Sequence, residues 1–138
     1  SLGEFMAIVV SLEYLADVNS NSKAKILANT LDIAIENLLK NGKSPKRKVG
    51  DLDNRGSHFY LAMYWSEALV NQNEDPELKA VFENVSLAIK EKENIILHEL
   101  NNTQGTPKNI NGYYYPNTDV TCAYMRPSDT FNDIIDNL

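Results

Sequence analysis

The stretch SHFYLAMYWSEALVNQ, residues 57–72, decides the fold, because its large apolar residues recur on nearly every side of a helix. A helix that is apolar around most of its circumference is usually buried by its neighbours. The sequence therefore predicts a central helix here, with Ser57 as its N-cap. Tyr64 and Trp65 are predicted to belong to the core around it.

Further helices are predicted from apolar spacing and from residues that cap helices. Asp75 and Pro76 form a strong helix start, and Gly42 is predicted to be a left-handed C-cap. No strand of useful length, internal repeat or low-complexity tract is evident. The sequence predicts a mainly α protein, a compact bundle of about four main helices with short C-terminal helices. The predicted helices cover 2–18, 23–40, 58–72, 76–101, 117–125 and 128–138.

Two details of these helices can be checked against the structure. Ser1 and Glu4 are typical of a capping box that opens the first helix. The long helix that begins at Pro76 is predicted to bend near Asn84 or Ser86.

Composition narrows the class of protein. The 138 residues suit one domain, and the net charge of −6 argues against general binding to nucleic acid or to anionic membranes. The longest apolar run near the start, 5–10, is too short to span a bilayer. The lone cysteine, Cys122, excludes an internal disulfide, favours a reducing cytoplasm and is predicted to be a small buried hydrophobe.

The segment KSPKRKVGDLDNR, residues 43–55, is a basic exception in this acidic chain. Its glycines and proline predict a loop over 41–56. Cations beside a helix N-terminus suit a phosphate or a carboxylate, so an anion site is one hypothesis. The alternative is a solvated loop whose cations pair with Asp51 and Asp53 and with the acidic surface. The cations are Lys43, Lys46, Arg47, Lys48 and Arg55.

Other side chains that could carry chemistry are scattered. His58 and His98 are too far apart in the sequence to form a metal pair at helical spacing, and no glycine-rich phosphate loop or paired-cysteine motif is present. The sequence alone assigns no catalytic residue and no metal ligand. The tyrosines at 113–115 could form an aromatic platform, although they are predicted to cover the core or to face a neighbouring domain.

Four sequence blocks stand out, in this order: SLGEFMAIVVSLEYLA (1–16), KSPKRKVGDLDNRGSHFYLAMYW (43–65), QGTPKNINGYYYPN (104–117) and MRPSDTFN (125–132). Together they resemble the monomeric type of NADP-dependent isocitrate dehydrogenase, a bacterial family. The resemblance implies that the chain is the C-terminal piece of a longer one, a single helical region of that enzyme's smaller α/β domain. It also implies oxidation of isocitrate by NADP to 2-oxoglutarate and carbon dioxide, with Mg²⁺ or Mn²⁺ required by the full-length enzyme.

The resemblance carries over one site residue. Arg47 corresponds to the family's late NADP-binding arginine, within a cofactor loop at 41–57. The family's metal-binding and substrate-binding residues lie upstream of Ser1, so the resemblance implies no catalytic or metal residue here and an isolated chain that is inactive. The missing N-terminal part becomes the natural partner. Apolar surface made for it predicts self-association of the isolated chain.

Two other hypotheses compete with the resemblance. One is a freestanding helical interaction module that docks through the tyrosine loop and the helix at 58–72, which contains Trp65. The other is a helical domain that binds phosphate or RNA through the basic loop, which the acidic charge balance disfavours.

Overall fold

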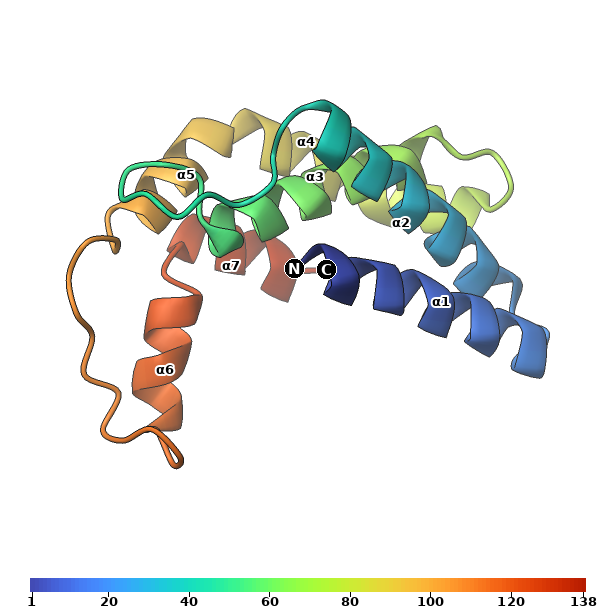
Figure 1. Ribbon diagram of the computed structural model, residues 1–138. Coiled ribbons are helices and arrows are strands. Elements are labelled where there is room, and N and C mark those ends of the chain that lie inside the picture. The colour runs from blue at the N-terminus through green and yellow to red at the C-terminus, as the bar shows by residue number, and fades with distance from the viewer.

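The structure is a computed structural model that describes residues 1–138 (Figure 1). It contains helices and loops and no strand, which confirms the mainly α prediction. The helices are α1 (Leu2–Asn19), α2 (Ser22–Lys40), α3 (Asn54–Asn71), α4 (Pro76–Glu91), α5 (Glu93–Asn101), α6 (Thr118–Met125) and α7 (Asp129–Asp136).

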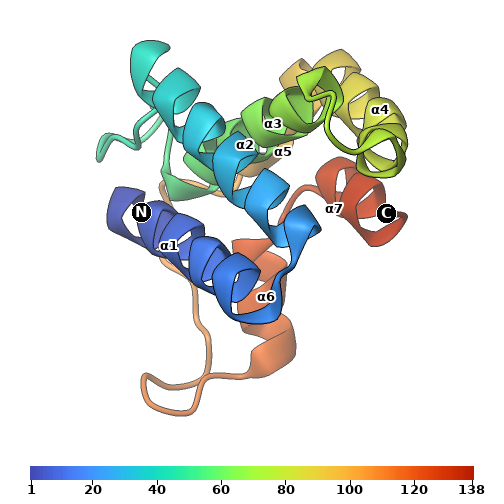
Figure 2. The same ribbon diagram turned by 90° about the vertical axis from the view of Figure 1, so that its right-hand side faces the viewer.

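The bundle is built around α3. Helices α1 and α2 form an antiparallel pair, and α3 packs between α2 on one side and α4 and α5 on the other (Figures 1 and 2). Helix α7 packs against α4 and α5. The segment 102–117 and α6 project from the bundle as an arm (Figure 1). None of the helices is both long enough and apolar enough to span a bilayer.

The core lies where α3 meets its neighbours, so the prediction that 58–72 forms the central helix is confirmed. The ring of Phe59 is fully buried and meets the ring of Phe131 of α7 edge-on, with 5.4 Å between centroids. Tyr64 is buried, whereas Trp65 is half-buried and donates from Nε1 to Thr30 Oγ1 at 3.0 Å. The largest fully buried apolar side chains are Phe59, Leu31, Leu38, Leu69, Ile89 and Ile96.

Helix α3 begins at Asn54, so the prediction of Ser57 as its N-cap is wrong. The cap is Asp53, whose Oδ1 accepts from the Gly56 N–H at 3.0 Å. Ser57 is fully buried, and its hydroxyl has no hydrogen-bond partner. The extra turn fits because a Cβ at Gly56 would collide with the side chain of Leu52, and glycine has none.

The predicted fourth helix is in fact two helices, α4 and α5, which separate at Lys92. The predicted bend near Asn84 or Ser86 is therefore wrong. No glycine or proline marks the break, so local sequence gives no signal for it. Tertiary contacts hold the new direction, including the hydroxyl of Tyr60, which donates to Glu93 Oε1 at 2.6 Å.

The other helix ends follow the predicted signals, apart from the start of α1. Asp75 caps α4, and Gly42 adopts a left-handed φ of 63° directly after the C-cap of α2. The capping box at the start of α1 is only half present, because Glu4 Oε2 lies 3.5 Å from the Ser1 amino nitrogen but the Ser1 hydroxyl makes no cap bond. Ser1 occupies the N-cap position, but its hydroxyl donates to Asn54 Oδ1 at 2.9 Å and makes no cap.

Two further predictions, both about residues of the arm, are wrong. Cys122 is exposed, as α6 contributes no residue to the core. Tyr113, Tyr114 and Tyr115 are 88%, 85% and 92% exposed, so they do not cover the core. Their contact with a neighbouring domain stays a prediction.

Candidate functional site

The basic loop between α2 and α3 is closed by its own backbone. The N–H of Lys46 donates to the carbonyl of Leu52 at 2.7 Å, which brings the two ends of the tip together. The N–H of Asp51 donates to the carbonyl of Lys48 at 3.0 Å and closes a turn within it. Arg47 lies between Lys46 and Lys48, so these two hydrogen bonds restrain the backbone on both sides of it.

The five cations of the segment 43–55 have different surroundings. The ammonium of Lys43 lies 4.0 Å from the centre of the Tyr60 ring. Arg55 pairs with Asp53, with 2.6 Å between Nη2 and Oδ2. The side chains that are exposed and take part in no ion pair are Lys46, Arg47 and Lys48.

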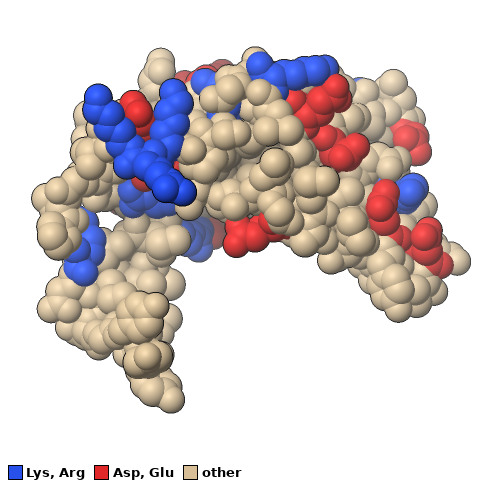
Figure 3. Space-filling view, viewed as in Figure 1, with Lys and Arg blue, Asp and Glu red and all other residues tan.

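The hypothesis of a solvated loop with internal ion pairs is therefore only half right. Asp51 pairs with no cation, and Asp53 pairs with Arg55 alone. The three free cations gather at one end of the molecule, where Figure 3 shows Lys and Arg side chains crowded over the loop. Unpaired cations this close together favour an anion, because each one raises the local positive potential.

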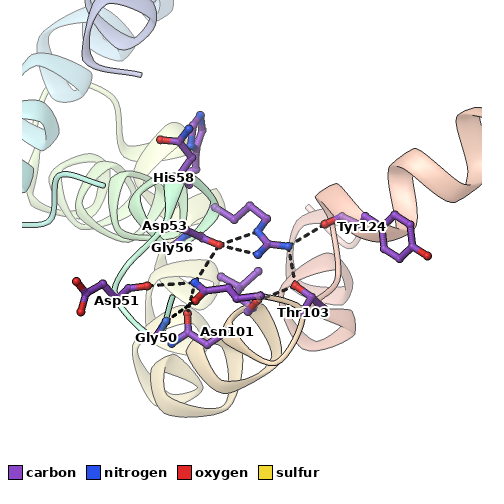
Figure 4. A network of polar contacts seen from close by, with 12 residues as sticks. Gly50, Asp51, Asp53, Gly56, His58, Asn101, Thr103 and Tyr124 are labelled. Atoms are coloured by element: carbon purple, nitrogen blue, oxygen red, sulfur yellow. Dashed lines mark hydrogen bonds and ion pairs between the residues drawn. The ribbon is translucent and has the colours of Figure 1, made fainter. Parts of the chain in front are cut away.

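Arg55, by contrast, makes all its contacts within the protein (Figure 4). Its guanidinium donates twice to Asp53 Oδ2, at 2.6 and 3.0 Å. From Nη1 it also donates to Thr103 Oγ1 at 2.6 Å and to the carbonyl of Tyr124 at 2.9 Å. It thus joins the start of α3 to both ends of the arm, and we assign it no ligand.

The N-terminus of α3 is already capped by a carboxylate. Partial burial alone would raise the pKa of Asp53. Hydrogen bonds from Arg55, from the Gly56 N–H and from Gln104 outweigh burial, so the pKa lies below its usual value. The charged carboxylate occupies the positive end of the helix. The helix end therefore adds less to an anion site than the sequence suggested, and the side chains of the loop must do the binding.

A hollow of about 590 Å³ runs beside the loop. Its lining is mostly polar or charged and is exposed or half-buried, and its volume suits a phosphate-bearing portion of a ligand. Its walls include Lys46, Arg47, Asp53, Asn54, Arg55 and Met125. This hollow, with the free cations Lys46 and Arg47 on its rim, forms the candidate site.

The two histidines, His58 and His98, lie on different helices and form no site together. His58 is exposed, and its Nδ1 lies 2.6 Å from the carbonyl oxygen of Asn54. His98 is near the end of α5, with its Nε2 2.9 Å from Asn102 Nδ2. No group of three or more His, Cys, Asp or Glu side chains is placed to hold a metal ion.

Comparison with known proteins identifies the family. The profile described as “Monomeric isocitrate dehydrogenase” matches residues 1–136. The chain belongs to this family. The resemblance seen in its sequence blocks is therefore confirmed.

The similar family members are named as isocitrate dehydrogenases. Isocitrate dehydrogenase (NADP) from Azotobacter vinelandii is 54% identical over 132 residues, which cover 96% of this chain and 18% of the relative. Isocitrate dehydrogenase (NADP) 2 from Colwellia maris is 52% identical over 138 residues, 100% of this chain and 19% of the relative. Isocitrate dehydrogenase (NADP) 2 from Mycobacterium tuberculosis is 49% identical over 132 residues, 96% and 18% respectively. The chain spans about a fifth of the length of the curated relatives it matches.

Sequence reasoning missed the residues that hold the loop from outside. Gln104 contacts Gly50, Asp51 and Asp53, although it follows each of them by more than fifty positions. In the sequence, Gln104 stands out only as part of one of the blocks that resemble the family. That membership does not show which residues it contacts. A pairing across that distance in sequence becomes visible only in the folded chain.

Proposed function

We propose that this chain is the C-terminal, NADP-contacting region of an enzyme that oxidises isocitrate to 2-oxoglutarate and carbon dioxide. Family membership and the names of the relatives support this activity for the longer protein. The helical bundle contributes structural core and one cofactor contact. The catalytic groups and the ligands for Mg²⁺ or Mn²⁺ come from the rest of the longer chain.

Arg47 is the residue of this chain that contacts NADP. The observation that carries this assignment is that the Arg47 side chain is available to a ligand. It is exposed, takes part in no ion pair and lies on the rim of the hollow. Arg55, by contrast, is held by Asp53 within the fold. A guanidinium can donate two parallel hydrogen bonds to a phosphate. Lys46 and Lys48 flank it and add positive charge. Bound NADP supplies the hydride acceptor, and these side chains act on its phosphates.

The test is the Arg47→Ala variant of the full-length enzyme. Loss of a charge-assisted contact is expected to raise the KM for NADP about tenfold or more. The kcat should stay within about twofold, because the contact holds substrate and transition state alike. The matched control is Lys40→Ala, which removes an exposed cation that pairs with Glu36 at 2.7 Å on α2. Equal KM values for Arg47→Ala and wild type would contradict the assignment.

The same variant distinguishes the two kinds of phosphate in the cofactor. A contact with the ribose phosphate raises the KM for NADP and leaves that for NAD unchanged, because NAD lacks this group. A contact with the bridging phosphates raises both by a similar factor. Steady-state kinetics with each cofactor, at one fixed salt concentration, measures the difference.

A further inference from the structure

The backbone that carries Arg47 leads directly into a tight turn. This turn is closed by the bond from the Asp51 N–H to the Lys48 carbonyl, and Gly50 within it has a φ of +91°. Glycine adopts such a φ at no steric cost, whereas other residues do so rarely. The direction of the Arg47 side chain therefore depends on how firmly this turn is held.

One side chain from another loop holds the turn on both sides. Gln104 Oε1 accepts from the Gly50 N–H at 2.8 Å, and Nε2 donates to the carbonyl of Asp51 at 3.1 Å. The same Nε2 lies 3.1 Å from Asp53 Oδ2. An amide can accept and donate at once, whereas a carboxylate only accepts and an ammonium only donates. The amide of Gln104 thus matches a site that presents both a donor and acceptors.

Gln104 is itself anchored to the end of α5. Its backbone N–H donates to the carbonyl of Asn101 at 3.1 Å, and its Nε2 lies 3.2 Å from Asn101 Oδ1. The next residue, Gly105, lies under the tip of the basic loop. A Cβ there would come within 3.1 Å of Val49 Cγ1. The two loops therefore touch through a side-chain clamp and a close backbone approach.

We propose that Gln104 is a positioning residue for NADP binding, acting by holding the turn that follows Arg47. The inference rests on the proposed contact of Arg47 with NADP and adds a residue outside the cationic segment. A loop that is ordered before the cofactor arrives loses less conformational entropy on binding. Loss of the clamp therefore weakens the binding of NADP while leaving the catalytic groups untouched.

The experiment uses the full-length enzyme with two substitutions at this position. Gln104→Ala removes the clamp and is expected to raise the KM for NADP about fivefold, with kcat within about twofold. Gln104→Glu keeps the size but turns a carboxylate toward the Asp51 carbonyl and the Asp53 carboxylate, so its effect should be at least as large. The double variant Arg47→Ala/Gln104→Ala should match Arg47→Ala alone, because the two residues act on one contact.

The chain contains a matched control. Gln72 holds the loop between α3 and α4 in the same manner. Its Oε1 accepts from the N–H groups of Glu74 and Asp75, both at 2.8 Å, and its Nε2 donates to the carbonyl of Asp75 at 2.7 Å. Gln72→Ala therefore removes the same chemistry from a loop remote from Arg47. The KM for NADP should be unchanged in this variant.

A second readout needs no cofactor. Trypsin cleaves after Lys46, Arg47 and Lys48 once the loop opens, so cleavage there reports how firmly the turn is held. In Gln104→Ala the rate of cleavage at these bonds should rise about fivefold. In Gln72→Ala it should not change.

The two readouts separate the failure of this inference from that of the proposed function. Faster cleavage and a raised KM in Gln104→Ala support the positioning role. Unchanged cleavage, or a loss of kcat and thermal stability with an unchanged KM, overturns it even when Arg47→Ala behaves as proposed. Wild-type kinetics in Arg47→Ala overturn the cofactor contact, and the positioning role with it, while faster cleavage in Gln104→Ala would still support the clamp on the loop.

Discussion

Helices α1 and α3 are both apolar around most of their circumference, yet only α3 is enclosed. Helix α3 packs against α2, α4 and α5, whereas α1 packs mainly against α2. The outer side of α1, here called the α1 outer face, exposes large apolar side chains: Met6, Val10, Tyr14 and Val18, at 54%, 63%, 69% and 60%. The difference teaches that apolar spacing predicts a helix but not the number of neighbours that cover it.

The largest expected effect comes from emptying the centre of α3. Phe59→Ala removes a fully buried ring that contacts the rings of Tyr60 and Phe131. The substitution should lower the free energy of unfolding by about 3–5 kcal/mol, through lost burial and the cavity that remains. Urea unfolding followed by circular dichroism measures it. A loss below about 1 kcal/mol would show that α3 is no better enclosed than α1.

A middle-sized effect is expected at the helix starts, where α3 has a side-chain cap and α1 has none. Asp53→Ala removes the cap and the ion pair with Arg55, so it should cost at least about 0.5–2 kcal/mol in the same unfolding assay. Ser57→Ala is the control. Its hydroxyl has no partner, so its removal should be neutral or slightly stabilising. A larger cost for Ser57→Ala than for Asp53→Ala would reverse the assignment of the cap.

The charge of Asp53 adds a pH dependence to this prediction. Its pKa is lowered in the folded chain, so its stabilisation is fully present above the usual aspartate pKa of about 3.9 and is lost as pH falls through the folded value. Asp53→Asn keeps a good cap but loses the charge that faces Arg55. The wild type should be more stable than this variant near neutral pH, and the gap should close in acid. A gap that is constant with pH would contradict the role of the charge.

The smallest effect is expected on the α1 outer face. Val10→Ala should change the free energy of unfolding by less than about 0.5 kcal/mol, because the side chain is exposed.

The α1 outer face is also expected to drive self-association of the isolated chain, and Val10→Glu should weaken this self-association. Sedimentation over a range of concentrations measures this. A wild-type chain that is strictly monomeric at high concentration would contradict the expectation.

Local signals predicted most of the helices correctly. The left-handed Gly42, the Asp75–Pro76 start and the apolar spacing of α3 each act through nearby backbone, so the sequence shows them directly. The errors arose where two local signals compete or where none exists. Asp53 and Ser57 are both good caps one turn apart, and contacts to Asp53 from Arg55 and Gln104 favour the earlier one.

The candidate site was predicted less completely than the fold. The cationic run and the family resemblance singled out Arg47, and its role in binding NADP stays a prediction. The exposure of Cys122 and the break at Lys92 could not be predicted, because both depend on where distant helices pack. Gln104 was missed for the same reason.

The sequence by itself determined the helices and a concentration of positive charge before α3, because helical spacing, caps and charge runs are local properties. Only the tertiary structure decided which cations are free. Arg55 meets Thr103 and Tyr124, which lie 48 and 69 positions further along the chain, and is tied down. Arg47, eight positions earlier in the same run, meets no such partner and stays free to bind an anion.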